Sequence, residues 1–176
     1  MLDIHAINKD KNLFALPEYP LITIYDDNWF VRNDYDILSL GQRQYLVKYF
    51  TKIGFKQVTG RNLKRDNLTL HFPRPQSNLA ISNHLEKFHY CDNKNFYMVT
   101  PTEFAEVVFY DLPKLGEERT IAKIKTLINK CPYNIEWLRD ISYASPIEKI
   151  TKKTFNGLME YQRDVVEKQF KYKRAL

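Results

Sequence analysis

The stretch from Ser39 to Pro75 constrains this chain most, because it combines strong secondary-structure signals with an extreme charge bias. Ser39 and Gln42 have the spacing of a capping box, in which each side chain satisfies a free backbone N–H of the first helical turn. Gly54 can take the left-handed conformation that ends a helix. The stretch is therefore predicted to begin with a helix over residues 40–53.

This predicted helix is amphipathic. Apolar residues recur at three- and four-residue spacing, as expected for a face that packs on a core. The predicted buried face consists of Leu46, Tyr49, Phe50 and Ile53. Lys48 and Lys52 fall on the other side, so the helix is expected to present basic side chains to solvent.

A hairpin is predicted after Gly54. Residues 55–59 and 68–72 alternate in strand fashion, and the polar residues 60–67 separate them. Pro73 then ends the second strand, because proline cannot donate to a sheet ladder. The hairpin is expected to have two strands and a basic loop at its tip.

Eight basic residues and a single acid, Asp66, occupy this stretch. Lysine and arginine side chains that reach solvent without acidic neighbours are suited to contact phosphate groups. The candidate nucleic-acid-binding residues are Arg43, Lys48, Lys52, Lys56, Arg61, Lys64, Arg65 and Arg74.

Charge also alternates along the whole chain. Residues 119–176 form a second basic block with thirteen bases and six acids, whereas residues 1–40 and 82–118 are acidic. The two basic blocks would form one positive face if the fold brought them together. The alternative is that neighbouring blocks of opposite sign neutralise each other within the fold.

Length and composition favour one domain over residues 1–176, of which 44% are apolar. Residues 1–20 are expected to be an irregular lead-in. The chain shows neither a long apolar run nor a basic N-terminus followed by an apolar segment, which predicts no membrane span and no secretory signal. Cys91 and Cys131 are too few for a disulfide framework, so a cytoplasmic location is expected.

Helical signals dominate the second half of the chain. Thr100 to Glu103 is a capping box with proline at the first helical position, and the helix that follows is apolar over more than half its circumference, with Val108 central. Further helices are predicted at residues 117–130 and 135–141. A long basic helix is predicted over residues 146–176.

These signals predict the fold class. Strand patterns at residues 21–25, 55–59, 68–72 and 96–99 mix with the helices without regular βαβ alternation. We therefore expect an α+β fold, with a small antiparallel or mixed sheet, helices packed on one face and a helix-rich C-terminal half.

Signals for catalysis and metal binding are weak. The chain has no Gly-rich phosphate loop, no G-x-S-x-G and no H-E-x-x-H, so neither a cofactor nor a catalytic residue is predicted. Glu103 and Glu106 are interpreted as first-turn acids that favour the positive end of a helix dipole. Residues with weak alternative readings as metal ligands or as a general acid or base are Asp26, Asp27, Asp34, Asp36, His71, His84, His89 and Cys91.

Three functional hypotheses remain. The first is a nucleic-acid-binding accessory protein that contacts DNA or RNA through the basic helix and the basic hairpin loop, with the basic C-terminal tail adding affinity. The second is an intracellular protein-interaction module, such as an inhibitor, immunity or assembly subunit, that binds an acidic protein partner and uses Trp29, Tyr35 or Trp137 as anchors. The third is a phosphoesterase or nuclease whose site is assembled in space.

Overall fold

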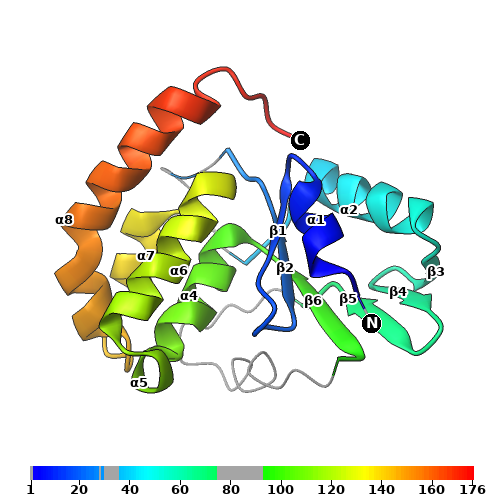
Figure 1. Ribbon diagram of the computed structural model, residues 1–176, viewed down its shortest axis with the longest axis horizontal. Coiled ribbons are helices and arrows are strands. Elements are labelled where there is room, and N and C mark those ends of the chain that lie inside the picture. The colour runs from blue at the N-terminus through cyan, green and yellow to red at the C-terminus, as the bar shows by residue number, and fades with distance from the viewer. Residues whose placement is uncertain (1, 28, 30–35, 75–92) are drawn as a thin grey trace.

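A mixed sheet divides the molecule into two layers of helices (Figure 1). The structure is a computed structural model and describes residues 2–27, 29, 36–74 and 93–176. Within these residues the sheet has six strands in the order β1-β2-β6-β5-β4-β3. Their bounds are β1 Leu13–Ala15, β2 Leu21–Ile24, β3 Lys56–Thr59, β4 Asn62–Arg65, β5 Leu68–His71 and β6 Asn95–Val99.

Strand direction changes across the sheet. The central strand β6 runs parallel to both of its neighbours, β2 and β5, whereas the outer pairs β1–β2, β5–β4 and β4–β3 are antiparallel. The parallel pairs join segments far apart in the sequence, and the antiparallel pairs join neighbours through short turns. The predicted mixed sheet and α+β class are confirmed.

Helices cover both faces of the sheet, where the sequence predicted one covered face. On one face lie α1 (Ile4–Lys9) and α2 (Leu40–Lys52), which share an apolar cluster with strand residues such as Ile22 and Phe96. The second apolar cluster contains strand residues such as Leu21 and Val99 together with residues of the C-terminal helices. Those helices are α4 Pro101–Tyr110, α5 Leu112–Leu115, α6 Glu117–Lys130, α7 Ile135–Ile141 and α8 Glu148–Val165.

Alternation in the strands explains the two clusters. Successive side chains of a strand point to opposite faces, so Leu21 enters one cluster and Ile22 the other. All four residues of β2 are buried, as expected for a strand covered on both faces. The predicted helix-rich C-terminal half is confirmed, and Val108 of α4 is fully buried.

The expectation of an irregular lead-in over residues 1–20 is wrong, because this segment contains α1 and β1. The side chain of Asp3 caps α1 by accepting a hydrogen bond from the Ala6 amide at 2.9 Å. Asn8 pairs with both the N–H and the C=O of Ala15, each at 2.9 Å. Both elements are short, so their local sequence pattern is faint and they depend on tertiary contacts. The strand β1 pairs with β2, and α1 contacts β1.

The predicted two-stranded hairpin is also corrected. Residues 60–67, expected to be a loop, contain β4, which pairs with β3 on one side and β5 on the other. Two-residue turns join these strands, and Asp66 in the second turn has a φ of 51°. Asp and Asn tolerate this left-handed conformation, so Asp66-Asn67 was the turn signal that divided the loop.

The predicted long helix over residues 146–176 ends early. α8 stops at Val165 and continues as a π-helical turn over Val166–Phe170. This turn accompanies the burial of Phe170, which stacks on Tyr25 with ring centroids 5.2 Å apart. Among the described residues, no helix is both long and apolar enough to cross a membrane.

Candidate nucleic-acid interface

The helix α2 holds the first candidate residues, and its ends are as predicted. The Ser39 amide donates to Gln42 Oε1 at 2.7 Å and the Gln42 amide donates to Ser39 Oγ at 3.2 Å, so the capping box is present. Gly54 has the left-handed φ of 93° expected beyond the end of the helix. Of the predicted buried face, Leu46 and Phe50 are fully buried and fix the rotation of the helix against the sheet, whereas Tyr49 is partly buried and Ile53 is 38% exposed.

Five of the eight candidate side chains are exposed along one rim of the sheet. Two lie on α2, one on β3, one in the β3–β4 turn and one on β4. The strand β3 is the outermost of this side, and all four of its residues are exposed. We call this group the basic edge; it consists of Lys48, Lys52, Lys56, Arg61 and Lys64.

The basic edge extends around both sides of the rim. Leu63 enters the apolar cluster beneath α2, so its neighbour Lys64 points to the opposite face of the sheet. Lys56 lies directly across from Lys64 in the β3–β4 register, which puts two like charges side by side. Lys52 is the last residue of α2, four residues before Lys56 in the sequence.

Arg43 and Arg65 have structural contacts instead. Arg43 donates to the Gly60 carbonyl oxygen at 3.0 Å and its guanidinium lies 4.3 Å from the centre of the Phe72 ring. Arg65 donates to the Ile53 carbonyl oxygen at 2.6 Å and lies 4.7 Å from the Phe55 ring centre. These two arginines tie α2 to β3, β4 and β5, so they position the basic edge more than they extend it.

Arg74 is the remaining candidate. It is exposed and lies beyond β5, two residues after Phe72. The Phe72 amide donates to the Arg61 carbonyl oxygen at 2.8 Å, which places this end of β5 beside the β3–β4 turn. Arg74 therefore lies at the border of the basic edge.

The positive charge of the basic edge is not compensated locally. Across residues 2–27, 29, 36–74 and 93–176, none of its five side chains forms an ion pair. Several lysines of the C-terminal basic block, by contrast, are paired with acids: Lys123 with Glu18, Lys152 with Glu148, Lys153 with Glu117 and Lys168 with Asp164. The two basic blocks therefore differ in how much of their charge is available to a ligand.

His71 lies between two amides rather than beside an acid. Its Nδ1 is 3.0 Å from Asn62 Oδ1 and its Nε2 is 2.8 Å from Asn95 Oδ1, and the ring stacks on Tyr97. These contacts fix the orientation of the imidazole, and among the described residues no carboxylate pairs with it to support general base chemistry.

No metal site occurs in the described part of the chain, in which no three His, Cys, Asp or Glu side chains are grouped to hold an ion. Four residues with a weak alternative reading as metal ligands, Asp34, His84, His89 and Cys91, lie outside the described residues.

Glu103 lies in the first turn of α4 as predicted, but the burial of Glu103 and Glu106 was not predicted from the sequence. Glu103 and Glu106 are 9% and 2% exposed on α4. Burial raises the pKa of Glu103 well above its ordinary value, and the nearby carboxylates of Glu106 and Asp36 raise it further, against a smaller opposing effect of the Thr100 backbone. The signal was present in the sequence, because a helix apolar around most of its circumference buries its acids as well.

One of the proposed aromatic anchors is also corrected. Trp29 is only 9% exposed and packs against Tyr25 and Phe170, so it is part of the core. Tyr35 lies outside the described residues, and Trp137 is partly buried on α7.

Comparisons with protein-family models, with curated proteins and with solved structures found no match for this chain. Its function is therefore argued from the geometry of the site. Exposed lysines and arginines without acidic partners can contact phosphate oxygens of any nucleotide sequence. Because four of the five residues of the basic edge lie on a helix or a strand, their spacing is held by the packed core.

Proposed function

We propose that the protein binds nucleic acid through the basic edge. The observation that carries the proposal is the set of five exposed basic side chains around an outermost strand, none of them in an ion pair with another described residue. A polyanion neutralises such a surface and releases the counterions condensed on its own phosphates, which is the main driving force of sequence-independent binding.

The geometry supports contacts with the phosphate backbone of the nucleic acid more than sequence-specific contacts with its bases. The 13 residues of α2 make a rod of about 20 Å, which is the length of roughly six base pairs. Lysines predominate in the basic edge, and lysine acts on phosphate as a point charge. The expected binding is therefore weakly dependent on sequence and strongly dependent on salt.

The test removes four charges from the basic edge with the combined changes Lys48→Ala, Lys52→Ala, Arg61→Ala and Lys64→Ala. All four side chains are exposed, so the variant is expected to fold like the wild type. Its affinity at low salt should fall strongly, and the slope of log K against log salt should decrease by about 0.9 for each lost contact with duplex DNA. Fluorescence anisotropy with labelled single- and double-stranded DNA and RNA measures both quantities.

The matched control removes four exposed lysines of the C-terminal helices α6 and α8, with Lys125→Ala, Lys149→Ala, Lys152→Ala and Lys153→Ala. It changes net charge equally, so a general electrostatic effect would weaken both variants alike. Wild-type protein that binds none of the four nucleic acids, or a basic-edge variant that binds as well as the control, would contradict the proposal.

An acidic protein partner is the second candidate, and the exposed edge of β3 favours it. An outermost strand offers unpaired backbone groups to an added strand, and Val58 of β3 is 56% exposed. The strand is nevertheless short and irregular in register between Gln57 and Thr59, which limits indiscriminate pairing. Val58→Asp should abolish binding of an acidic extended partner while leaving nucleic-acid binding only slightly weaker.

A further inference from the structure

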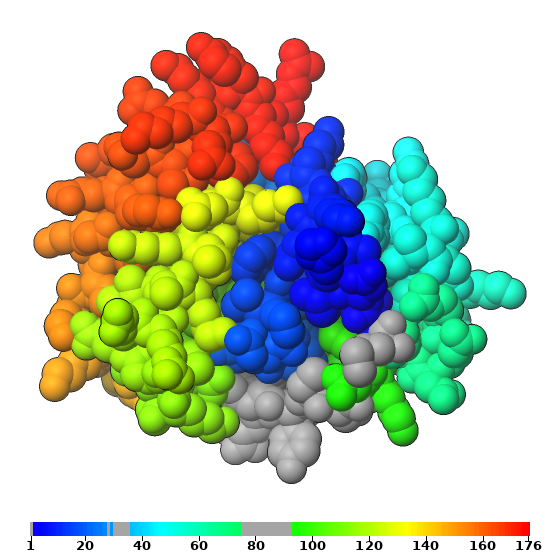
Figure 2. All heavy atoms as spheres, viewed as in Figure 1, coloured from blue at the N-terminus to red at the C-terminus, as the bar shows by residue number. Residues whose placement is uncertain are grey.

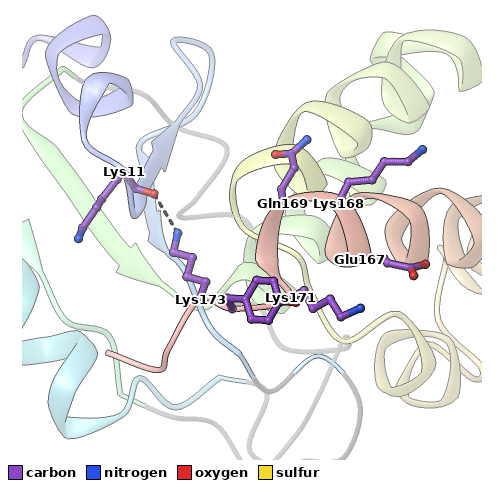
Figure 3. A pocket seen from close by; sticks show the side chains of 7 residues that line it. Lys11, Glu167, Lys168, Gln169, Lys171 and Lys173 are labelled. Atoms are coloured by element: carbon purple, nitrogen blue, oxygen red, sulfur yellow. Dashed lines mark hydrogen bonds between the residues drawn. The ribbon is translucent and has the colours of Figure 1, made fainter.

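A second basic surface lies at the C-terminal end of the chain. There, a groove of about 420 Å³ separates the residues after α8 from the loop between α1 and β1. Figure 3 shows that Lys173 reaches across toward the Lys11 backbone, whereas the side chains of Lys168 and Lys171 point away from this contact. Four lysines and one acid, Glu167, are among the residues that line it.

Lys173 anchors the segment. Its Nζ donates to the Lys11 carbonyl oxygen at 3.0 Å and lies 4.0 Å from the centre of the Tyr25 ring. Burial lowers the pKa of Lys173, and the charges of Lys130 and Lys11 act in the same direction, against the opposing effects of Cys131 and Asp10. Lys173 thus holds the two walls of the groove together, and Lys11 and Lys171 remain exposed and outside the ion pairs of the described residues.

The same segment reaches α2. A Cβ built on Gly41 would lie 2.0 Å from the Leu176 carbonyl oxygen, so the end of the chain rests against the first turn of α2. Figure 2 shows the C-terminal residues beside the N-terminal segment, and Figure 1 shows the end of the chain beside α2. The C-terminal wall of the groove and α2 are therefore neighbours in space although more than 110 residues separate them in sequence.

The exposed lysines of α2 point to this same side. Gly41, Tyr45, Lys48 and Lys52 follow one another at spacings of four, three and four residues, which places them on one stripe of the helix. Gly41 touches Leu176, and Tyr45 donates to the Asp10 carboxylate at 2.9 Å, next to Lys11. Lys48 and Lys52 thus continue the line of positive charge that begins at the groove.

The lysines of the groove suit an extended anion. Their amino groups do not converge on one point, as the ligands of a compact anion would (Figure 3). Glu167 is the acid among the residues that line the groove, and it is exposed. The nearby carboxylate of Asp10 accepts a hydrogen bond from Tyr45. Charges spread along a line match the regular phosphate spacing of a polynucleotide.

We infer that the groove between the C-terminal segment and the α1–β1 loop is a second phosphate-contacting surface, which binds the same nucleic acid as the basic edge and requires a longer ligand. This inference rests on the proposed function. A ligand that covers α2 alone reaches the basic edge, and a longer one continues past Leu176 onto Lys11 and Lys171.

The groove variant combines Lys11→Ala and Lys171→Ala. Its binding is compared with that of the wild type on hairpin duplexes with stems of about 8 and about 24 base pairs. With the long stem, the slope of log K against log salt should fall by about 0.9 for each lost contact, and with the short stem it should not change. Glu167→Gln, which removes the acid of the groove, should strengthen binding of the long stem only.

Controls separate this inference from the proposed function. The pair Lys125→Ala and Lys149→Ala removes the same charge from α6 and from the first turn of α8, outside the groove lining, and should leave both slopes unchanged. A wild type that binds neither stem contradicts the proposed function itself. If the basic-edge variant loses binding but the groove variant binds the long stem as well as the wild type, the inference about the groove is wrong and the proposed function stands.

Discussion

Side chains of the same type have different roles in this protein because they differ in burial. Lys173 and Lys48 are both lysines of basic segments, yet one is partly buried against aromatic rings and the other is exposed. Glu103 and Glu118 are both first-turn acids, and Glu103 is buried while Glu118 is exposed. A side chain's role therefore follows from where the packed core places it.

Glu103 makes a pH-dependent contribution to stability. Its pKa is raised in the folded state by burial and by the nearby acids, so the folded protein binds this proton more tightly than the unfolded chain. Stability from this group is complete below the unfolded pKa and is lost as the pH rises through the folded pKa. Glu103→Gln, which keeps the shape and stays neutral, should make the protein more stable than wild type at pH 8 and equally stable near pH 4.

Urea denaturation at several pH values measures this difference. Glu160→Gln changes an exposed acid of α8 and should leave the pH dependence as it is in wild type. A Glu103→Gln variant that is less stable than wild type at pH 8 would mean that the carboxylate is ionised and paired.

Arg43 and Arg65 show that charge alone does not tell which basic side chains also make structural contacts. Both belong to the candidate set from sequence, and both donate to backbone carbonyl oxygens in the structure. Those acceptors lie 17 and 12 residues away along the chain, beyond the reach of any local pattern.

At the scale of elements, α4 is the helix most deeply packed in the core. Nine of its ten residues are buried, and its first turn follows directly from the central strand β6. It contacts β2, α5, α6 and α7, so its apolar surface joins the sheet to the C-terminal helices. Substitutions there are expected to affect the whole molecule.

Val108→Asp should prevent folding, because the charge would be buried without a partner at a fully buried position. Val108→Ala should be milder, with a loss of about 2 kcal/mol from the two missing methyl groups and the cavity they leave. Circular dichroism during thermal unfolding measures both. Val58→Ala on the exposed strand β3 is the control and should change stability by less than about 0.5 kcal/mol. A Val108→Asp variant that unfolds at the wild-type temperature would contradict the central role of α4 in the core.

At the scale of the whole molecule, residues 173–176 pack against the N-terminal half of the chain. Lys173 bonds to the backbone of Lys11, and Leu176 packs against both apolar clusters, one on each face of the sheet. The last residues thus connect the two layers that the sheet separates.

Gly41→Ala tests this packing. Alanine is favoured over glycine within a helix by about 1 kcal/mol, but here its Cβ would overlap the Leu176 carbonyl oxygen. We expect the C-terminal segment to be displaced, with faster amide hydrogen exchange and faster tryptic cleavage at Lys171 and Arg174. The control is Gly157→Ala in α8, where no atom lies within 4 Å of the added Cβ. It should stabilise the protein by up to about 1 kcal/mol without affecting the C-terminal segment. Equal hydrogen exchange of that segment in the two variants would show that the contact between Gly41 and Leu176 is unimportant.

Local signals in the sequence determined a large part of this fold. The capping box at Ser39, the glycine after the helix and the apolar spacing of Leu46 and Phe50 depend on residues within a few positions of one another, and the structure confirms them. The α+β class was inferred from such local patterns and is confirmed as well. The exposure of Lys48 and Lys52 followed from the same periodicity.

Tertiary contacts decided the rest. α1 and β1 are too short to be specified by their own pattern. β1 is held by β2 and α1 by β1, while the segment that contains β4 is rich in turn residues. The structural roles of Arg43 and Arg65, the burial of Glu103 and the closure of the C-terminal segment onto Gly41 all depend on partners distant in sequence. Helix caps and periodicity act over one or two turns, whereas burial and charge neutralisation depend on which distant surfaces meet, and only the packed structure brings those surfaces together.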